Sequence, residues 1–162
     1  AMNPCPCGHY GSTQRQCRCG TAAVQRYRNR ISGPLLDRID IQIEVSAISE
    51  DDLMNRPSGE SSAQIRARVM AARECQRARF ADSATRCNAG MTPSEIQCYC
   101  QLDHSCRLLL KQAISDLELS ARAYDRILRV ARTLADLAGD RDIAHGQIYE
   151  AVQYRSLDRR LW

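Results

Sequence analysis

Four cysteines near the start of the chain are spaced as two close pairs. They are Cys5 and Cys7, followed after nine residues by Cys17 and Cys19. Four thiolates that converge from a glycine-rich loop can hold a structural zinc ion in tetrahedral geometry. The gap of one residue within each pair is shorter than the usual two to four or so, so His9 could replace one cysteine, and metal-free thiols remain the alternative. A closed site of four cysteines would be structural and would perform no catalysis.

Arginines are concentrated in and after this loop. Residues 1–47 hold six arginines against three acidic residues, and the stretch from Arg15 to Arg30 holds five arginines and no acid. Such a segment is either a solvated face or a surface that contacts phosphates, of a nucleotide or of a nucleic acid.

Lys111 is the only lysine in the chain, and it lies in a Leu-Leu-Leu-Lys-Gln run that indicates a helix. A P-loop needs a glycine-rich turn that ends in Gly-Lys-Ser/Thr, because the lysine reaches the β- and γ-phosphates. The 162 residues contain no such turn. We therefore expect that this chain cannot hold a nucleoside triphosphate in the P-loop manner unaided and is inactive alone.

The first 60 residues predict a loop, one short helix and one strand. Residues 3–20 are rich in Pro, Gly and Cys and predict a loop, after which Thr21 can cap a short helix that Gly33-Pro34 ends. Four apolar residues then alternate with polar ones: Ile39, Ile41, Ile43 and Val45. This alternation predicts a half-buried strand over residues 39–45. No second convincing strand follows, so we expect its partners outside the chain. The acidic stretch that follows predicts a linker, placed at residues 48–60.

Everything after the linker indicates helices. Capping sequences mark where four of them begin: Ser61 with Gln64, Thr92-Pro93-Ser94-Glu95, Asp103 and Ser120. A fifth helix is predicted from about Gly146. Several helices of these lengths, joined by short loops, predict a small bundle. Single cysteines within these helical patterns, Cys75 and Cys106, are expected to pack in the core as small hydrophobic residues. Cys98, Cys100 and Cys106 with His104 form a weaker candidate for a metal cluster, and we expect core packing there as well.

The composition suits a folded protein of the cytoplasm. Apolar residues make up 44% of the chain, which is normal for a domain with a core. An odd number of cysteines, nine, favours reduced thiols over a disulfide framework. No apolar run approaches the roughly 18 residues that span a bilayer, and no secretory signal is evident, so we expect a cytoplasmic protein without membrane contact.

Two strings near the start, in this order and at this separation, resemble the second half of the ATPase core in magnesium-chelatase-like AAA+ proteins. They are Met-Asn-Pro-Cys-Pro-Cys-Gly at residues 2–8 and Ser-Gly-Pro-Leu-Leu-Asp-Arg-Ile-Asp at residues 32–40. Four further segments resemble the C-terminal domain of the same family: residues 59–62, 119–124, 130–137 and 150–155. The resemblance covers nearly the whole chain and, because of Asn-Pro-Cys-Pro-Cys-Gly, is closest to the ComM/YifB branch.

This resemblance implies roles for three residues. Asn3 matches sensor 1, the polar residue that helps to position the attacking water near the γ-phosphate; the alternative is an asparagine that makes the turn before Pro4. Arg38 matches the arginine finger, which reaches the nucleotide of the neighbouring subunit; the alternative is a local ion pair with Asp37 or Asp40. Arg122 matches sensor 2, which contacts the γ-phosphate within its own subunit, and the alternative is a solvated arginine.

Two hypotheses follow from these patterns. In the first, the chain is the C-terminal part of a ring-forming AAA+ ATPase, with residues 1–47 from the α/β core and residues 61–162 forming a helical lid. The intact protein would use ATP and Mg²⁺ and would form a homo-oligomer, expected to be a hexameric ring. The resemblance also implies that it remodels DNA, by branch migration in natural transformation. Arginines of the predicted long helix would then be DNA-facing together with those from Arg15 to Arg30: Arg66, Arg68, Arg73, Arg77 and Arg79.

In the second hypothesis the chain is a non-enzymatic module, a zinc loop with a helical bundle that binds nucleic acid or protein. The missing P-loop favours it. The orphan strand and a chain that starts at a sensor position favour the first hypothesis, because both are expected of a fragment.

Overall fold

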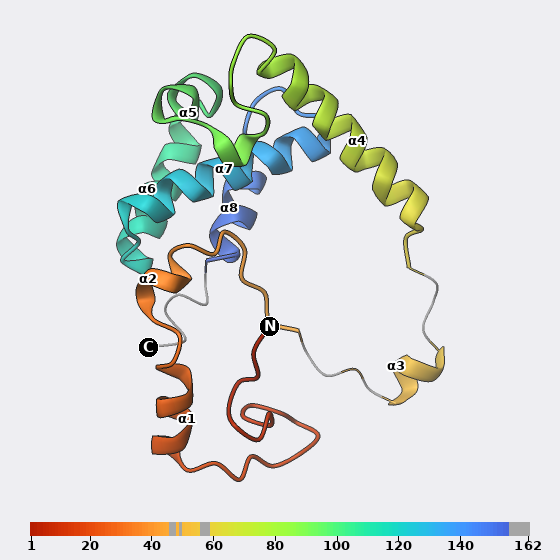
Figure 1. Cartoon of the computed structure of the whole chain (residues 1–162), viewed down its shortest axis with the longest axis vertical. Coiled ribbons are helices and arrows are strands. Elements are labelled where there is room, and N and C mark those ends of the chain that lie inside the picture. The colour runs from red at the N-terminus through yellow and green to blue at the C-terminus, as the bar shows by residue number, and fades with distance from the viewer. Residues whose placement is uncertain (46–47, 49, 56–58, 156–162) are drawn as a thin grey trace.

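The computed structural model describes residues 1–45, 48, 50–55 and 59–155. Within this part the regular elements are all helical, and they follow one another in this order: α1 (Thr21–Arg28), α2 (Gly33–Leu36), α3 (Glu50–Asn55), α4 (Ser62–Arg79), the 3-10 turn η1 (Asn88–Gly90), α5 (Pro93–Tyr99), α6 (His104–Leu117), α7 (Ala121–Ala138) and α8 (His145–Gln153). Helices α4 to α8 gather at one end of the molecule, and the N-terminal loop with α1 lies at the other end (Figure 1). The predicted mainly α fold with a helical bundle is confirmed.

The helices of the bundle begin where the capping sequences predict. The Ser61 and Thr92 hydroxyls accept from the N–H groups of Gln64 and Glu95, and both capping boxes are complete. Asp103 and Ser120 cap α6 and α7 in the same manner. Because each cap satisfies an N–H group that the helix itself leaves unpaired, these four boundaries depend on local chemistry.

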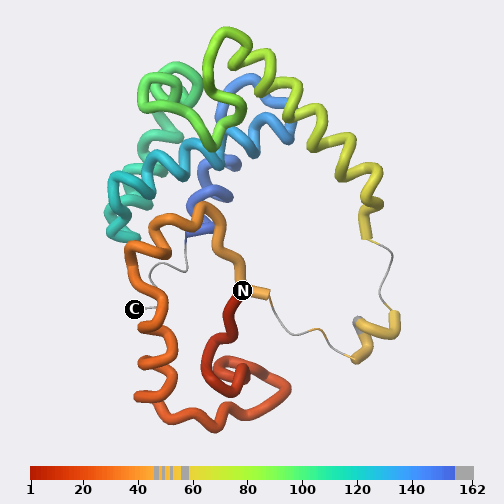
Figure 2. Tube along the Cα trace, viewed as in Figure 1, coloured from red at the N-terminus to blue at the C-terminus, as the bar shows by residue number. Residues whose placement is uncertain are grey.

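The core of the bundle is centred on α7, which packs against α4, α5, η1 and α8. Its buried face consists mainly of small and aliphatic residues: Ala123, Ile127, Leu128, Ala131 and Ala135. Helix α4 contacts α7 through its C-terminal half, where Ala72 and Gln76 are buried, whereas residues 62–71 are all exposed. The path in Figure 2 shows this first half of α4 leading from α3 toward the bundle.

The carboxylate of Asp136 ties α4, η1 and α7 together inside the bundle. Arg79 donates to both of its oxygens at 2.5 and 2.8 Å, Arg132 donates at 3.1 Å, and the Asn88 amide donates at 2.7 Å. Burial opposes ionisation of Asp136, but the hydrogen bonds from Arg79 and Asn88 outweigh it and hold the pKa of this carboxyl below its usual value.

Replacing Asp136 by asparagine should lower the free energy of unfolding by about 3 to 5 kcal/mol, because it leaves the buried Arg132 without its counter-charge. Urea denaturation followed by circular dichroism measures this loss. The matched control is Glu60→Gln, which breaks the exposed ion pair with Arg68 and should cost about 1 kcal/mol or less. Equal effects of the two substitutions would contradict a structural role for the Asp136 network.

The strand predicted over residues 39–45 is wrong for this structure. Residues 41–45 have no regular secondary structure, and Ile41, Ile43 and Val45 are 51, 65 and 82% exposed. The Gln42 N–H donates to the Tyr154 carbonyl at 3.0 Å, which is a bond to the end of α8 and not part of a ladder. A strand needs a neighbour for its backbone groups, and the described part of the chain supplies none.

Several local predictions also need correction. Gly33-Pro34 begins the one-turn helix α2, since proline is favoured in the first turn. The N-cap of α1 is Gly20, one residue before Thr21. Cys100 and Cys106 are buried as expected, but Cys75 and Cys98 are exposed, because they lie on the solvent sides of α4 and α5. A short helix, α3, lies within the region predicted as linker.

Among the helices that the structure describes, none combines the length and the apolar character needed to cross a bilayer.

Candidate functional site

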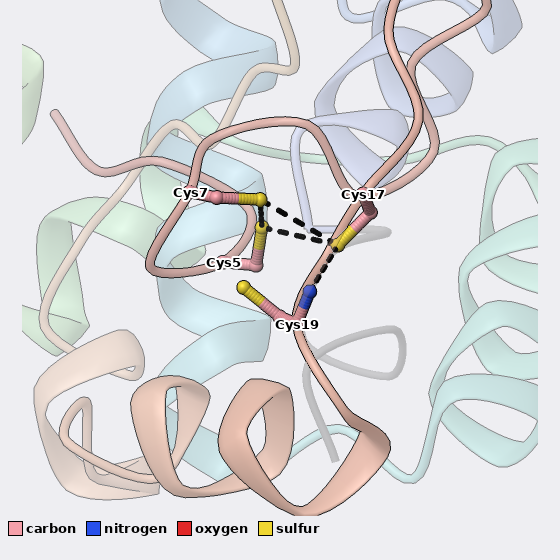
Figure 3. Close-up of side chains that lie close together, drawn as sticks. All are labelled: Cys5, Cys7, Cys17 and Cys19. Atoms are coloured by element: carbon pink, nitrogen blue, oxygen red, sulfur yellow. Dashed lines mark hydrogen bonds between the residues drawn. The ribbon is translucent and has the colours of Figure 1, made fainter.

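The four cysteines of the N-terminal loop converge on one point, as their spacing predicts (Figure 3). Cys5 and Cys7 come from a tight turn in which the Gly8 N–H donates to the Cys5 carbonyl at 3.0 Å, and Gly8 has a φ of 80° that favours glycine. Cys17 and Cys19 come from the segment that leads into α1. His9, the alternative ligand, does not belong to the group of four.

The distances between the sulfur atoms suit a tetrahedral metal site. Sγ of Cys5 lies 3.4 Å from Sγ of Cys7 and 3.7 Å from Sγ of Cys17, and Cys7 and Cys17 are also 3.7 Å apart. All four sulfur atoms lie within 4.8 Å of one another. Zinc–sulfur bonds of about 2.3 Å in a tetrahedron set the sulfur atoms about 3.8 Å apart. The cluster therefore needs only small adjustments to hold zinc.

The ionisation of these thiols also suits a cation. Backbone N–H groups of His9 and Arg18 lower the pKa of the Cys7 thiol to about 6. A backbone N–H of Cys7 favours the thiolate of Cys19, but the crowded neighbouring sulfur atoms and burial outweigh it and raise the pKa of Cys19 to about 12. A divalent cation among the four sulfur atoms would remove this conflict, because it lets all four thiols ionise together.

Arg38 lies in a turn that other residues hold against the bundle. Asp37 pairs with the buried Arg155 at 3.4 Å and accepts a hydrogen bond from the Ser120 hydroxyl at 3.2 Å. Asp40 forms an ion pair with Arg126, which also donates to the Arg38 carbonyl at 3.0 Å. The two aspartates that could have paired locally with Arg38 are thus occupied by Arg126 of α7 and by Arg155, which follows α8. The Arg38 side chain is exposed, and none of the described residues forms a hydrogen bond or ion pair with it.

Arg122 stands out among the four arginines of α7. Arg126 pairs with Asp40, Arg129 donates to the Met91 carbonyl at 2.8 Å, and Arg132 is buried against Asp136. Arg122, in the first turn of α7, is exposed, and its side chain has no such partner within the described part of the chain. The first turn of a helix also presents free N–H groups that favour an anion.

Asn3 lies at the surface beside the cysteine loop, where its amide carbon is 3.8 Å from the position that a Cβ on Gly8 would take. Asn3 therefore lies with the cysteine loop, whereas Arg38 and Arg122 lie on two segments that contact each other through Asp37 and Ser120.

Sequence reasoning missed the residues that hold the Arg38 turn in place. Arg126 and Arg155 act from 86 and 118 residues away in the chain. The signal that was available is the pair of aspartates on either side of Arg38, since acids of a turn commonly need a basic partner.

Comparisons with known proteins place the chain in a family. Residues 59–155 match the family model of the C-terminal region of magnesium chelatase subunit ChlI, and residues 1–53 match the model of magnesium chelatase subunit ChlI. The chain belongs to the magnesium chelatase ChlI family. It is 43% identical over 162 residues to competence protein ComM of Haemophilus influenzae and 40% identical over 163 residues to YifB of Escherichia coli. The alignments cover 99% of this chain but 31% of the length of either relative.

Proposed function

We propose that this chain completes the nucleotide sites of a ring-forming AAA+ ATPase of the ComM type that remodels DNA. One observation carries the proposal: the side chains of Arg38 and Arg122 are exposed and have no hydrogen bond or ion pair among the described residues. The neighbouring arginines are all engaged within the fold: Arg126, Arg129, Arg132 and Arg155. Exposed guanidinium groups on a firmly held turn and helix start are suited to phosphate groups from outside the chain. Membership of the ChlI family supplies the reaction class.

In this proposal Arg38 is the arginine finger. Its guanidinium would lie against the γ-phosphate bound by the neighbouring subunit and offset the charge that develops there during transfer to water. Arg122 would contact the γ-phosphate as sensor 2, and Asn3 would orient the attacking water as sensor 1. ATP and Mg²⁺ would be bound by a P-loop outside these 162 residues, because the 162 residues contain no P-loop sequence.

The domain organisation that we propose follows the same logic. Residues 1–47 belong to the nucleotide-binding core, residues 48–60 connect, and residues 61–162 form the lid. The exposed apolar residues from Ile39 to Val45 belong to the part that we assign to the core.

DNA is the substrate that we propose for the ATP-driven motion. One relative, 43% identical, carries the name competence protein, and the residues from Arg15 to Arg30 bring five positive charges without an acid. We propose branch migration in natural transformation, carried out by a homo-oligomeric ring, expected to be a hexamer.

The test of this function uses the full-length protein, ATP and a labelled three-strand DNA junction. We expect displacement of the labelled strand that depends on ATP, and no hydrolysis by residues 1–162 alone. Hydrolysis without strand movement would remove the DNA part of the proposal. A full-length protein without hydrolysis would remove the ATPase and leave the alternative, a non-enzymatic module that binds nucleic acid or protein.

We further propose that the cysteine cluster holds a structural zinc ion through Cys5, Cys7, Cys17 and Cys19. The ion would fix the loop that leads into α1 and would take no part in the reaction. Protein purified without chelator should contain one equivalent of zinc by mass spectrometry of the metal, and the Cys17→Ser variant should contain much less.

The matched control for zinc is Cys75→Ser, which removes an exposed thiol far along the chain from the loop and should leave one equivalent bound. One equivalent in both variants would show that the four-cysteine site is wrong.

A further inference from the structure

The cysteine loop and α1 form a single body. Cys19 is separated from the first residue of α1, Thr21, only by the N-cap Gly20. At the other end of the helix, Arg28 reaches back to the loop: its guanidinium lies 4.7 Å from the ring centre of Tyr10, and its Nε donates to the Pro4 carbonyl at 3.4 Å. The side chains that α1 exposes are therefore held in a defined position relative to the cysteine cluster.

This body carries a concentrated positive charge. Residues 1–36 contain five arginines and no acid. Arg28 is used to join the helix to the loop, and the other four are exposed, with no side-chain hydrogen bond or ion pair to any residue that the structure describes: Arg15, Arg18, Arg26 and Arg30. Four exposed guanidinium groups on a segment whose own sequence contains no acid attract a polyanion.

Helix α4 is the other arginine-rich element, and most of its arginines are already paired. Arg68 forms a double hydrogen bond with Glu60, Arg77 pairs with Glu74, and Arg79 pairs with Asp136. Arg73 donates to the Gln76 side chain at 3.3 Å, which leaves Arg66 as the one arginine of α4 without a side-chain partner among the described residues. Two arginines of α4, Arg66 and Arg73, are therefore not paired with an acid, against four on the cysteine loop and α1.

An aromatic ring lies within this charged surface. Tyr10 is 48% exposed although the guanidinium of Arg28 lies over its ring. Surfaces that bind single strands combine a basic track with exposed aromatic rings on which bases stack, and duplex DNA keeps its bases stacked on one another. The combination of free arginines with Tyr10 is therefore suited to a single strand.

We infer that the cysteine loop and α1 form a binding surface for single-stranded DNA, in which Arg15, Arg18, Arg26 and Arg30 contact phosphates and a base stacks on Tyr10. This inference rests on the DNA substrate of the proposed function and names the element that contacts it. The cysteine cluster enters as the positioning element, because it sets where α1 begins.

The first test measures binding of a fluorescent oligothymidine to the full-length protein by anisotropy. Arg26→Gln together with Arg30→Gln should weaken binding about tenfold or more in low salt and should make the slope of log K against log salt shallower by about 1.4, for two lost phosphate contacts. The matched control removes the same charge from α4, with Arg66→Gln and Arg73→Gln, and should bind as wild type. A loss confined to the α4 pair would overturn the inference.

The second test separates stacking from charge. Tyr10→Ala should weaken binding of oligothymidine roughly five- to a hundredfold, and Tyr10→Phe should bind within about twofold of wild type, because stacking needs the ring and not the hydroxyl. An abasic oligonucleotide of the same length should bind to Tyr10→Ala and to the wild-type protein with equal affinity. Equal affinity of Tyr10→Ala and wild type for oligothymidine would overturn the stacking role.

The third test concerns the cysteine loop. Cys17→Ser should weaken oligothymidine binding at least as much as the Arg26/Arg30 pair, whereas Cys75→Ser should not change it. Unchanged affinity in a Cys17→Ser protein with unchanged helix content would show that the cluster does not position the surface.

ATP hydrolysis without DNA distinguishes this inference from the proposed function. The arginine and Tyr10 variants should hydrolyse ATP as wild type does in the absence of DNA, since none of these residues has a role at the nucleotide. If they bind DNA normally while the wild type still hydrolyses ATP, only the present inference fails. If the wild-type protein hydrolyses no ATP, the ATPase part of the proposed function fails while the binding result stands. A higher KM for ATP in these variants with unchanged DNA affinity would assign the surface to a nucleotide instead.

Discussion

Replacing Arg38 by alanine in the full-length protein should lower kcat for ATP hydrolysis roughly 10³- to 10⁵-fold, the range that arginine fingers contribute in other nucleotide hydrolases. The expectation depends on an Arg38 charge that the flanking aspartates do not neutralise. Asp37 is held by Ser120 and Arg155, and Asp40 is held by Arg126. The guanidinium is thus available to a phosphate group from outside the chain. Steady-state release of phosphate measures the loss.

Two comparisons make this result specific to the finger. Arg38→Lys should recover little activity, because an ammonium group cannot reproduce the planar fork that binds two phosphate oxygens. Arg141→Ala removes an exposed arginine whose carbonyl, and not its side chain, contacts Arg132, and it should keep full activity. Affinity for a labelled ATP analogue should change little in Arg38→Ala, since the finger acts mainly when charge develops. An Arg38→Ala protein that hydrolyses ATP at the wild-type rate would exclude the finger role.

The bundle could be predicted well because its boundaries depend on local chemistry. Ser61, Thr92, Asp103 and Ser120 each cap a helix through an N–H group three residues away. The strand at residues 39–45 could not be predicted in this way. Alternation of apolar and polar residues shows which face would be buried, but it does not supply the neighbouring strands that would bury it.

The candidate sites divide along the same line. Convergence of Cys5, Cys7, Cys17 and Cys19 was predictable, because two close pairs of cysteines in one loop are a pattern typical of metal sites. The setting of Arg38 was not predictable, because Arg126 and Arg155 belong to distant segments that only the tertiary fold brings together. Burial of Cys75 and Cys98 was predicted wrongly. Position within a helix does not show which side faces the core when the neighbouring residues are mixed.

The contacts between the Arg38 turn and α7 bear on which nucleotide Arg122 serves. The Ser120 hydroxyl, at the cap of α7, donates to Asp37, and Arg126, one turn after Arg122, holds both Asp40 and the Arg38 carbonyl. The turn and the start of α7 are thus joined by direct contacts. Family resemblance implies that Arg122 acts within its own subunit, and the contacts between the two segments raise the alternative that both arginines act on the nucleotide of the neighbouring subunit.

Mixed rings of two inactive variants distinguish these arrangements. Arg38→Ala should be inactive, and Arg122→Ala should lose roughly 10²-fold or more in kcat as a lost phosphate contact. If one subunit supplies both arginines to its neighbour, every interface in a one-to-one mixture lacks one of them, and we expect the mixture to stay inactive. If Arg122 serves its own subunit, about one interface in four joins an intact Arg122 to an intact Arg38, and phosphate release should return to about a quarter of the wild-type rate. Energy transfer between donor- and acceptor-labelled subunits would show that the rings exchange subunits. An inactive mixture would then mean that both arginines act on the same nucleotide, and not that the variants failed to mix.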